Sequence, residues 1–290
     1  MEYIKKLLIL FILGLAFVGC GDDEKAPRVA VDGSIRVAAF NVQVFGQSKR
    51  SKPEVMDVLA RTAREFDIML VQELRDASET TAQHYLDTIN AMSGPDYAFV
   101  RSPRLGREKS KEAYAYFYNA STVECTSDYV WDDVGDVFER EPYIVSFRSG
   151  NFDFTLVGIH VKPDDAETEI GALAKVYSAI LAGNPDERDI IILGDFNADG
   201  SYFDEDGASP LKTSQFTWTI TNDMDTMTKT DWTYDRIVMT YATAEHEYDS
   251  AQVFRFDSVF GIVDQELTED VSDHFPVYAT FQTDLVDDDG

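Results

Sequence analysis

One stretch decides the fold of this chain: Asp189-Ile-Ile-Ile-Leu-Gly-Asp195-Phe-Asn197-Ala-Asp199-Gly. Four branched apolar residues in succession are typical of a strand that is buried on both faces. The run ends at a glycine, and two carboxylates and an amide follow it. A rigid buried strand that delivers polar groups at its end is how many α/β proteins build a site. Alone, the stretch favours a strand followed by a structural Asx-type turn over a functional site, so the ends of the other strands must decide.

The composition is that of a globular protein. The chain has 290 residues, of which 44% are hydrophobic, and its 19 Phe and 14 Tyr can fill a substantial core. The formal net charge of −28 excludes a broad basic face of the kind that holds nucleic acid. It is compatible with an acidic surface enzyme that uses divalent cations.

The N-terminus has the pattern of a secretory signal. Lys5 and Lys6 precede an apolar run over 7–18, which is too short to span a bilayer comfortably. Gly19 and Cys20 follow, and this arrangement resembles a bacterial lipobox with Cys20 as the lipidated residue. An ordinary signal peptide or an N-terminal anchor helix is the alternative. The expectation is an exported lipoprotein, anchored to the outer membrane or cell surface.

Four segments follow from this pattern: a lipoprotein signal peptide over 1–19, an acidic tether over 20–33, a catalytic domain over 34–283 and an acidic tail over 284–290. The one cysteine besides Cys20 is Cys125, whose role the sequence does not indicate. If Cys20 carries lipid, no internal disulfide can form, so the core alone must stabilise the fold.

Strands and helices alternate at the start of the domain. The apolar periodicity predicts a strand over 34–40, a helix over 53–66, a strand over 67–71 and a helix over 80–92. After Gly94-Pro95 the pattern changes to strands rich in aromatic residues, expected over 97–101, 113–118, 123–131, 143–148 and 152–161. A helix over 168–181 and strands over 189–193, 234–239, 251–256 and 275–281 complete the domain. Two similar β/α halves, stacked face to face, would produce this order.

Several of these strands begin or end in polar residues that suit a site: Asn41, Glu73, His160, Asp195 with Asn197, Asp235, and Asp273 with His274. The remaining two histidines differ, since His84 falls within a predicted helix and His246 in a polar loop. Both are expected on the surface.

Oxygen ligands such as Glu73, Asn41 and Asp273 select hard cations, and the sequence lacks the histidine or cysteine spacing of a zinc site. Two imidazoles oriented by carboxylates suit the attack of water on a phosphodiester. One histidine accepts the proton of the water and the other protonates the leaving alkoxide, while a metal offsets charge on the phosphate.

Five motifs resemble, in order, those of the endonuclease/exonuclease/phosphatase superfamily: Phe40-Asn41-Val-Gln-Val-Phe-Gly46, Val71-Gln-Glu73-Leu, Gly194-Asp-Phe-Asn197, Tyr234-Asp-Arg-Ile237 and Ser272-Asp-His274. Further segments are similar to its deoxyribonuclease I branch: Leu105-Gly-Arg107, Lys111-Glu112, Arg140-Glu-Pro142 and Ser214-Gln-Phe-Thr-Trp218. The similarity covers about 34–283. It implies an α/β fold, namely a four-layer α/β/β/α sandwich of two packed mixed sheets flanked by helices.

The resemblance implies a role for each matching residue. Glu73, with Asn41 and Asp273, would bind the catalytic Mg²⁺ or Mn²⁺. Asp195 and Asn197 would position the scissile phosphate. The two acid/base centres would be His160 paired with Glu112 and His274 paired with Asp235, with the acid and the base unassigned. The DNA contacts would be Arg75, Arg107 and Arg140, and a loop resembling a structural Ca²⁺ site would comprise Asp225, Thr226, Thr228 and Thr230.

A cationic island supports contact with double-stranded DNA. Five basic residues stand against one acid, Glu108, between 101 and 111: Arg101, Arg104, Arg107, Lys109 and Lys111. Phosphate contacts beside the catalytic residues would use such a local patch, and a solvated loop with a chance excess of charge is the alternative.

The chain also departs from the family pattern. Gln43 stands where the family has an arginine, and Ser110 where it has a tyrosine that stacks on a sugar. The cysteines of both family disulfides are missing, and Gly200 and Trp232 occupy the places of the longer bridge. DNA affinity and cleavage preference are therefore expected to differ from those of the secreted animal enzymes.

The leading hypothesis is a secreted, lipid-anchored, divalent-metal-dependent endodeoxyribonuclease that hydrolyses DNA phosphodiester bonds with little sequence specificity. Two alternatives stay open: a superfamily phosphodiesterase or phosphatase that acts on another phosphate ester, and an inactive surface binding lipoprotein. The sequence indicates no protein partner.

Overall fold

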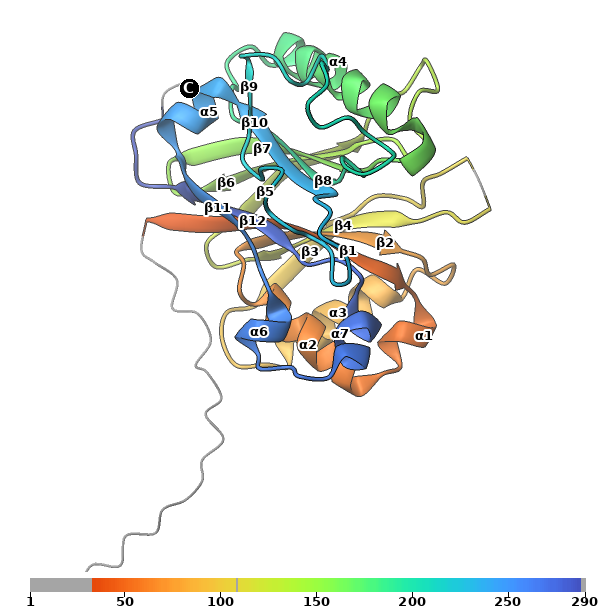
Figure 1. Ribbon diagram of the computed structural model, residues 1–290. Helices are drawn as coiled ribbons and strands as arrows, with labels where there is room; N and C mark the ends of the chain where they lie inside the picture. The colour runs from red at the N-terminus through yellow and green to blue at the C-terminus, as the bar shows by residue number, and fades with distance from the viewer. Residues whose placement is uncertain (1–32, 108, 288–290) are drawn as a thin grey trace, which may run out of the picture.

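The computed structural model describes residues 33–107 and 109–287. Two six-stranded sheets pack face to face in the middle of the molecule, and helices cover both outer faces (Figure 1). The predicted four-layer α/β/β/α sandwich of two mixed sheets is therefore confirmed.

Sheet one contains both ends of the domain. Its strands have the order β11-β12-β1-β2-β4-β3, with the bounds β1 Ser34–Phe45, β2 Ile68–Leu74, β3 Tyr97–Arg101, β4 Ala113–Asn119, β11 Tyr248–Val253 and β12 Val277–Gln282. The pair β1 and β2 is parallel, and the other pairs are antiparallel. The last strand of the chain therefore lies beside the first.

Sheet two repeats this plan with the middle of the chain. Its order is β5-β6-β7-β8-β10-β9, with the bounds β5 Glu124–Val130, β6 Tyr143–Ser149, β7 Phe152–His160, β8 Ile190–Asp195, β9 Phe216–Trp218 and β10 Asp235–Thr240. Again one central pair, β7 and β8, is parallel. Each sheet thus has a parallel β-α-β unit at its centre, which agrees with the two stacked halves expected from the sequence.

Seven α-helices are present among the described residues. Five lie in the lower part of Figure 1, below sheet one: α1 Gln47–Arg50, α2 Pro53–Ala63, α3 Thr81–Asn90, α6 Phe256–Val259 and α7 Gln265–Val271. The short helix α5 Tyr241–His246 lies in the upper part, where it contacts β9, β10 and β11. The seventh, α4 Ala166–Gly183, follows a 3-10 turn, η1 Pro163–Asp165, and covers sheet two from the other side.

The structure explains why the residues of β8 are apolar on both faces of the strand. Ile191 and Leu193 point into the core between the sheets, whereas Ile190 and Ile192 point into the core under α4. Because successive side chains of a strand point to opposite faces, a central strand of this sandwich needs an uninterrupted apolar run.

Some elements differ from the sequence-based expectation. The strand expected over 251–256 occupies Tyr248–Val253 instead, and Phe256 already begins α6. The helices α1, α5, α6 and α7 and strand β9 were not predicted, because segments this short carry no clear periodicity. His246 is the last residue of α5, not part of a loop, but it is exposed, as is His84 on α3.

The signal peptide, Cys20 and nearly all of the tether lie outside the described residues, as do the last three residues of the tail. Within the described part of the chain, no helix combines the length and hydropathy needed to cross a membrane. The proposed segment boundaries stay predictions.

Gly194 is a glycine because two strands meet closely there. Its φ is +139°, and a Cβ atom at this position would lie 2.0 Å from the carbonyl oxygen of Ile159 in β7. We expect Gly194→Ala to lower the free energy of unfolding by about 3 kcal/mol or more, because the backbone must move. Chemical denaturation monitored by circular dichroism measures this.

Gly183→Ala is the matched control, since nothing lies within 4 Å of the Cβ it adds at the end of α4. It should change stability by about 1 kcal/mol at most. Equal stabilities of the two variants would contradict the close approach of β7 and β8.

Candidate active site

The strand register gathers the polar residues at one edge of the sandwich. In sheet two, Asp195 at the end of β8 lies opposite His160 in β7 and opposite Asp235 in β10. Asn41 and Glu73 lie toward the ends of the parallel strands β1 and β2 in sheet one. The carboxyl ends of both parallel pairs therefore meet at the same place.

The first histidine pair is buried. Nδ1 of His160 lies 2.7 Å from Oε1 of Glu112, which precedes β4 and is fully buried. The other ring nitrogen, Nε2, lies 3.4 Å from Oδ2 of Asp195. Glu112 thus orients the ring, and Nε2 points into the site.

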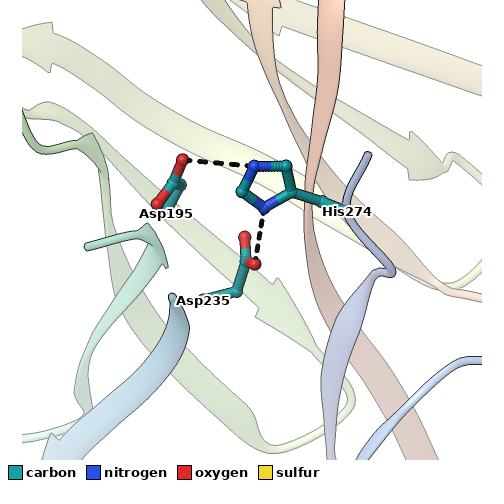
Figure 2. A group of neighbouring side chains, drawn as sticks. All are labelled: Asp195, Asp235 and His274. Carbon is teal, nitrogen blue, oxygen red and sulfur yellow. Dashed lines mark hydrogen bonds and ion pairs between the residues drawn. The ribbon is translucent and has the colours of Figure 1, made fainter. Parts of the chain in front are cut away.

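The second pair approaches Asp195 from the other side. Nδ1 of His274 lies 2.8 Å from Oδ2 of Asp235, and Nε2 lies 3.7 Å from Oδ2 of Asp195, as Figure 2 shows. His274 precedes β12 of sheet one, whereas both carboxylates belong to sheet two. The structure therefore brings together both predicted pairs, and their Nε2 atoms face the same oxygen.

Electrostatics differ between the two pairs. Burial would raise the pKa of Glu112, but His160 and Arg140 outweigh it and lower this pKa to about 2. Burial lowers the pKa of His160, and so does Arg140, yet Glu112 raises it more, so that it lies above its ordinary value. Each member of this pair therefore favours the charged form of the other.

The pair around His274 retains its proton more strongly. Burial opposes the charge on His274, but Asp235 and Asp195 together raise its pKa to about 10. Burial raises the pKa of Asp235, and the charge of Asp195 adds to this effect. Burial would also raise the pKa of Asp195, but His274 and His160 lower it below its ordinary value. Asp195 therefore carries the negative charge at the centre.

Hydrogen bonds hold Asp195 in place. Nδ2 of Asn41 donates to Oδ2 of Asp195 at 2.9 Å, and the backbone N–H of Asn197 donates to Oδ1 at 2.9 Å. Asn197 adopts a left-handed φ of +48°, and its side-chain amide donates to the carbonyl of Val161. The turn after β8 is thus an Asx-type turn and also part of the site.

The predicted metal ligands surround the same edge. Nδ2 of Asn41 also donates to Oε1 of Glu73 at 3.3 Å, and Glu73 has a left-handed φ of +59°. Oδ1 of Asp273 is a buried atom without a hydrogen-bond partner. A buried carboxylate oxygen without a hydrogen-bond partner, 3.8 Å from Nε2 of His274, is the type of ligand that a hard cation prefers. Asp195, Asp235 and His274 also place one possible ligand atom each within 4.8 Å of one another.

Two of the predicted DNA-contacting arginines lie within the site. Arg140 is buried, donates from Nε to the carbonyl of His160 at 3.0 Å, and has an Nη2 atom without a hydrogen-bond partner. Arg75 forms ion pairs with Glu73 at 3.2 Å and with Glu112 at 3.4 Å. A buried guanidinium nitrogen without a hydrogen-bond partner, beside the pair of His160 and Glu112, is suited to a phosphate oxygen.

Several basic side chains of the cationic island already have partners within the protein. Arg107 forms an ion pair with Glu139 at 3.2 Å, Arg101 pairs with Glu79, and Arg104 donates to the carbonyl of Lys111. Its exposed lysines, Lys109 and Lys111, and Ser110 form the neighbouring loop. Acids elsewhere in the sequence therefore neutralise part of this patch.

The predicted calcium loop lies next to the site. The hydroxyl of Thr226 accepts the backbone N–H of Tyr234 at 3.1 Å, and the N–H of Thr228 donates to the carbonyl of Asp273 at 2.8 Å. Asp225 accepts the N–H of Met227, and Thr230 is exposed. The loop is thus bonded to the residues that precede Asp235 and His274. Calcium binding by the loop stays a prediction.

Sequence reasoning assigned no role to several supporting residues. The hydroxyl of Tyr114 accepts the backbone N–H of His160 at 3.0 Å, and that of Ser272 donates to the carbonyl of Asn41 at 2.6 Å. The ammonium group of Lys49 donates to the carbonyls of Val42 and Val271, both at 2.8 Å. Only Ser272 had a signal, since it belongs to the last of the five motifs.

Comparison with known proteins identifies the relatives of this chain. The model of the Endonuclease/Exonuclease/phosphatase family matches residues 38–274. Deoxyribonuclease-1 of Oryctolagus cuniculus is 35% identical over 269 residues, which cover 88% of this chain and 95% of that protein. Deoxyribonuclease-1-like 2 of Mus musculus is 38% identical over 260 residues, covering 86% of this chain and 92% of that protein.

Solved structures share the fold. A family protein from Bacteroides thetaiotaomicron aligns with a TM-score of 0.59 at 17% identity, covering 87% of this chain and 96% of that one. Truncated Caenorhabditis elegans TDP2 aligns with a TM-score of 0.60 at 15% identity, covering 86% and 97%. The resemblance to the deoxyribonuclease I branch that the sequence motifs indicated is therefore confirmed. That the chain is a lipoprotein stays a prediction.

The low pKa of Glu112 predicts a pH-dependent contribution to stability. Its charge stabilises the fold above about pH 4.5, and this stabilisation is lost as the pH falls through about 2. We expect Glu112→Gln to be less stable than wild type by roughly 3 kcal/mol at pH 7, with the difference shrinking below pH 4.5. Urea unfolding between pH 7 and pH 2 measures this.

Glu124→Gln is the control, because Glu124 is exposed on β5. Its stability should stay within about 0.5 kcal/mol of wild type throughout. A Glu112→Gln difference that does not change with pH would mean that the carboxylate is not held in its charged form.

Proposed function

The chain belongs to the endonuclease/exonuclease/phosphatase family, and we propose that it is a divalent-metal-dependent endodeoxyribonuclease. It hydrolyses phosphodiester bonds of double-stranded DNA with little sequence specificity. One observation carries this proposal: two histidines, each oriented by a buried carboxylate, direct their Nε2 atoms at one oxygen of Asp195. In-line hydrolysis needs a base and an acid on opposite sides of one phosphorus atom, and this arrangement supplies both.

The surroundings of the histidines favour one assignment. His274 lies close to Asp235, Asp195 and, at 3.8 Å, Asp273, so it retains its proton and protonates the leaving alkoxide. Burial and the charge of Arg140 both disfavour the proton on His160, and they oppose the increase in its pKa that Glu112 causes. His160 in its neutral form accepts a proton from water at Nε2, while Glu112 holds Nδ1–H.

The remaining residues bind the phosphate and the metal. The unpartnered Nη2 atom of Arg140 binds a phosphate oxygen, and Asn197 with Asp195 positions the phosphate. Glu73, Asn41 and Asp273 would hold a Mg²⁺ or Mn²⁺ ion, which offsets the negative charge of the phosphate in the transition state. A structural Ca²⁺ ion at the loop of Asp225 to Thr230 is part of the same proposal.

Relatives named deoxyribonucleases, similar along most of the chain, favour DNA over other phosphate esters. Both histidine–carboxylate pairs are intact, and this disfavours an inactive binding protein. Among the described residues, however, the arginines of the cationic island are largely paired with acids or carbonyls. The substrate class is therefore the part of the proposal that needs the sharpest test.

We further propose that the enzyme is exported and lipid-anchored through Cys20 at the outer membrane or cell surface. Ser34 begins β1, and Asn41 lies seven residues further along the same strand, a distance of about 23 Å. A tether that enters at Ser34 would therefore leave the catalytic edge well away from its attachment point, accessible to a large substrate.

Plasmid nicking tests the enzymatic proposal. We expect the protein to nick supercoiled DNA with Mg²⁺ and Ca²⁺ present and to stop when a chelator is added. His160→Ala and His274→Ala should each lower the rate by about 10²- to 10⁴-fold, because each removes a proton-transfer group. His84→Ala, an exposed change on α3, should nick at the wild-type rate.

Intact plasmid with wild-type protein in both metals, or wild-type rates in both active-site variants, would rule the nuclease out. RNA and a chromogenic phosphodiester belong in the same assay. Faster turnover of either than of DNA would favour the phosphodiesterase alternative.

Membrane fractionation tests the anchor. In a Gram-negative host, we expect wild type to incorporate labelled palmitate and to sediment with the membranes, because an acylated cysteine partitions into lipid. Cys20→Ser should move to the soluble fraction, and the control Cys125→Ser should behave as wild type. A Cys20→Ser protein that still sediments with the membranes would contradict lipid anchoring.

A further inference from the structure

The segment that follows β8 and the segment that precedes β10, both in sheet two, are hydrogen-bonded to each other beside the site. The backbone N–H of Phe196 donates to the carbonyl of Tyr234 at 3.0 Å, and the N–H of Thr233 donates to Oδ2 of Asp199 at 2.7 Å. One segment directly follows Asp195 and the other directly precedes Asp235. Their mutual position therefore affects both carboxylates that His274 faces.

Trp232 packs across this junction. Gly200 has a left-handed φ of +64°, and a Cβ atom placed on it would lie 3.5 Å from Cε2 of Trp232, so the indole lies directly over the glycine. The ring centroid of Trp232 is 5.3 Å from that of Tyr234, which is in turn 6.4 Å from that of His274. A continuous aromatic row thus runs from the surface to the histidine.

We propose that Trp232 is a positioning residue for hydrolysis: its indole, packed on Gly200 and Tyr234, holds the segment after β8 and the ring of His274 in their catalytic arrangement. This inference rests on the proposed function for its kinetic consequence, but not for its structural one. The resemblance implies that Gly200 and Trp232 occupy the places of the longer family disulfide, and in this structure the two residues are in packing contact.

Direct contact of Trp232 with the substrate is the competing explanation, since 42% of the residue is exposed. Its surroundings oppose it. The carboxylate of Asp199 accepts a hydrogen bond from the residue after Trp232, and Asp231 precedes it. Acidic groups on both sides repel a phosphate backbone, so the exposed edge of the indole is poorly placed to bind nucleic acid.

Steady-state nicking by the full chain separates the two explanations. We expect Trp232→Ala to lower kcat about tenfold with KM within twofold, because small misplacements of catalytic groups reduce the rate of the chemical step. Trp232→Phe keeps a ring over Gly200 and should recover most of the lost kcat. The control is Tyr129→Ala, which removes a similarly exposed aromatic residue (45%) from the distant strand β5 and should leave both constants unchanged.

A raised KM with unchanged kcat would assign Trp232 to substrate binding and overturn the proposal. A lowered melting temperature with both constants unchanged would make it a purely structural residue and overturn it as well.

A second readout does not depend on any substrate. In the histidine side-chain NMR spectrum, Trp232→Ala, or Trp232→Leu if the alanine variant does not fold, should shift the resonances of His274 and leave those of His160 in place, because both variants remove the ring over Gly200. An unchanged His274 spectrum contradicts the proposal even if the protein cleaves DNA. A shifted spectrum supports it even if the natural substrate is another phosphate ester.

Discussion

One oxygen of Asp195 lies 3.4 Å from Nε2 of His160 and 3.7 Å from Nε2 of His274, and the remaining site residues are arranged around this carboxylate. A buried carboxylate costs several kcal/mol unless neighbours compensate its charge. The compensation here comes from both sheets, because His160 ends β7 of sheet two, whereas Asn41 lies on β1 of sheet one and His274 precedes β12 of that sheet. The active site is therefore also a polar junction between the sheets. The apolar core behind it fixes the sheet separation and, with it, the distance between the two histidines.

Strand register turns this junction into a site. Ile191 and Leu193 face the core between the sheets, and Asp195 continues their row at the edge. A slip of one residue in β8 would turn the carboxylate toward α4 and the isoleucines into the wrong layer. The burial of apolar residues on both faces of β8 therefore specifies the position of its charged end. Gly194 allows β7 to approach closely enough for His160 to lie opposite Asp195.

The sequence was informative where burial imposes a pattern. Apolar runs located the central strands, and polar residues at their ends indicated His160, Asp235 and His274 as site residues. The pairing of each histidine with its carboxylate, and Glu112 itself, came from the family resemblance. Short helices such as α6 and α7 were not predicted. The conformation of a segment of four to seven residues depends on its contacts with the rest of the fold and not on local periodicity. The same limit applies to Trp232. Nothing local distinguishes an indole that packs on a glycine 32 residues away from any other exposed aromatic residue.

An anionic substrate and a chain with a net charge of −28 are compatible once the range of each interaction is considered. Solvent-exposed charges are screened beyond about 10 Å at 0.1 M salt, whereas buried groups are screened far less. With DNA as the substrate, the exposed acids would therefore affect mainly its approach to the protein. Arg140, which is buried beside His160, would act on a phosphate that is already bound. The cationic side chains that would act in hydrolysis therefore lie inside the site, where Glu112 orients both His160 and Arg140. The exposed arginines of the island are paired with acids and contribute less. The cationic groups inside the site and the charge of the surface can therefore vary independently on this fold. An acidic surface is thus compatible with a site that hydrolyses DNA.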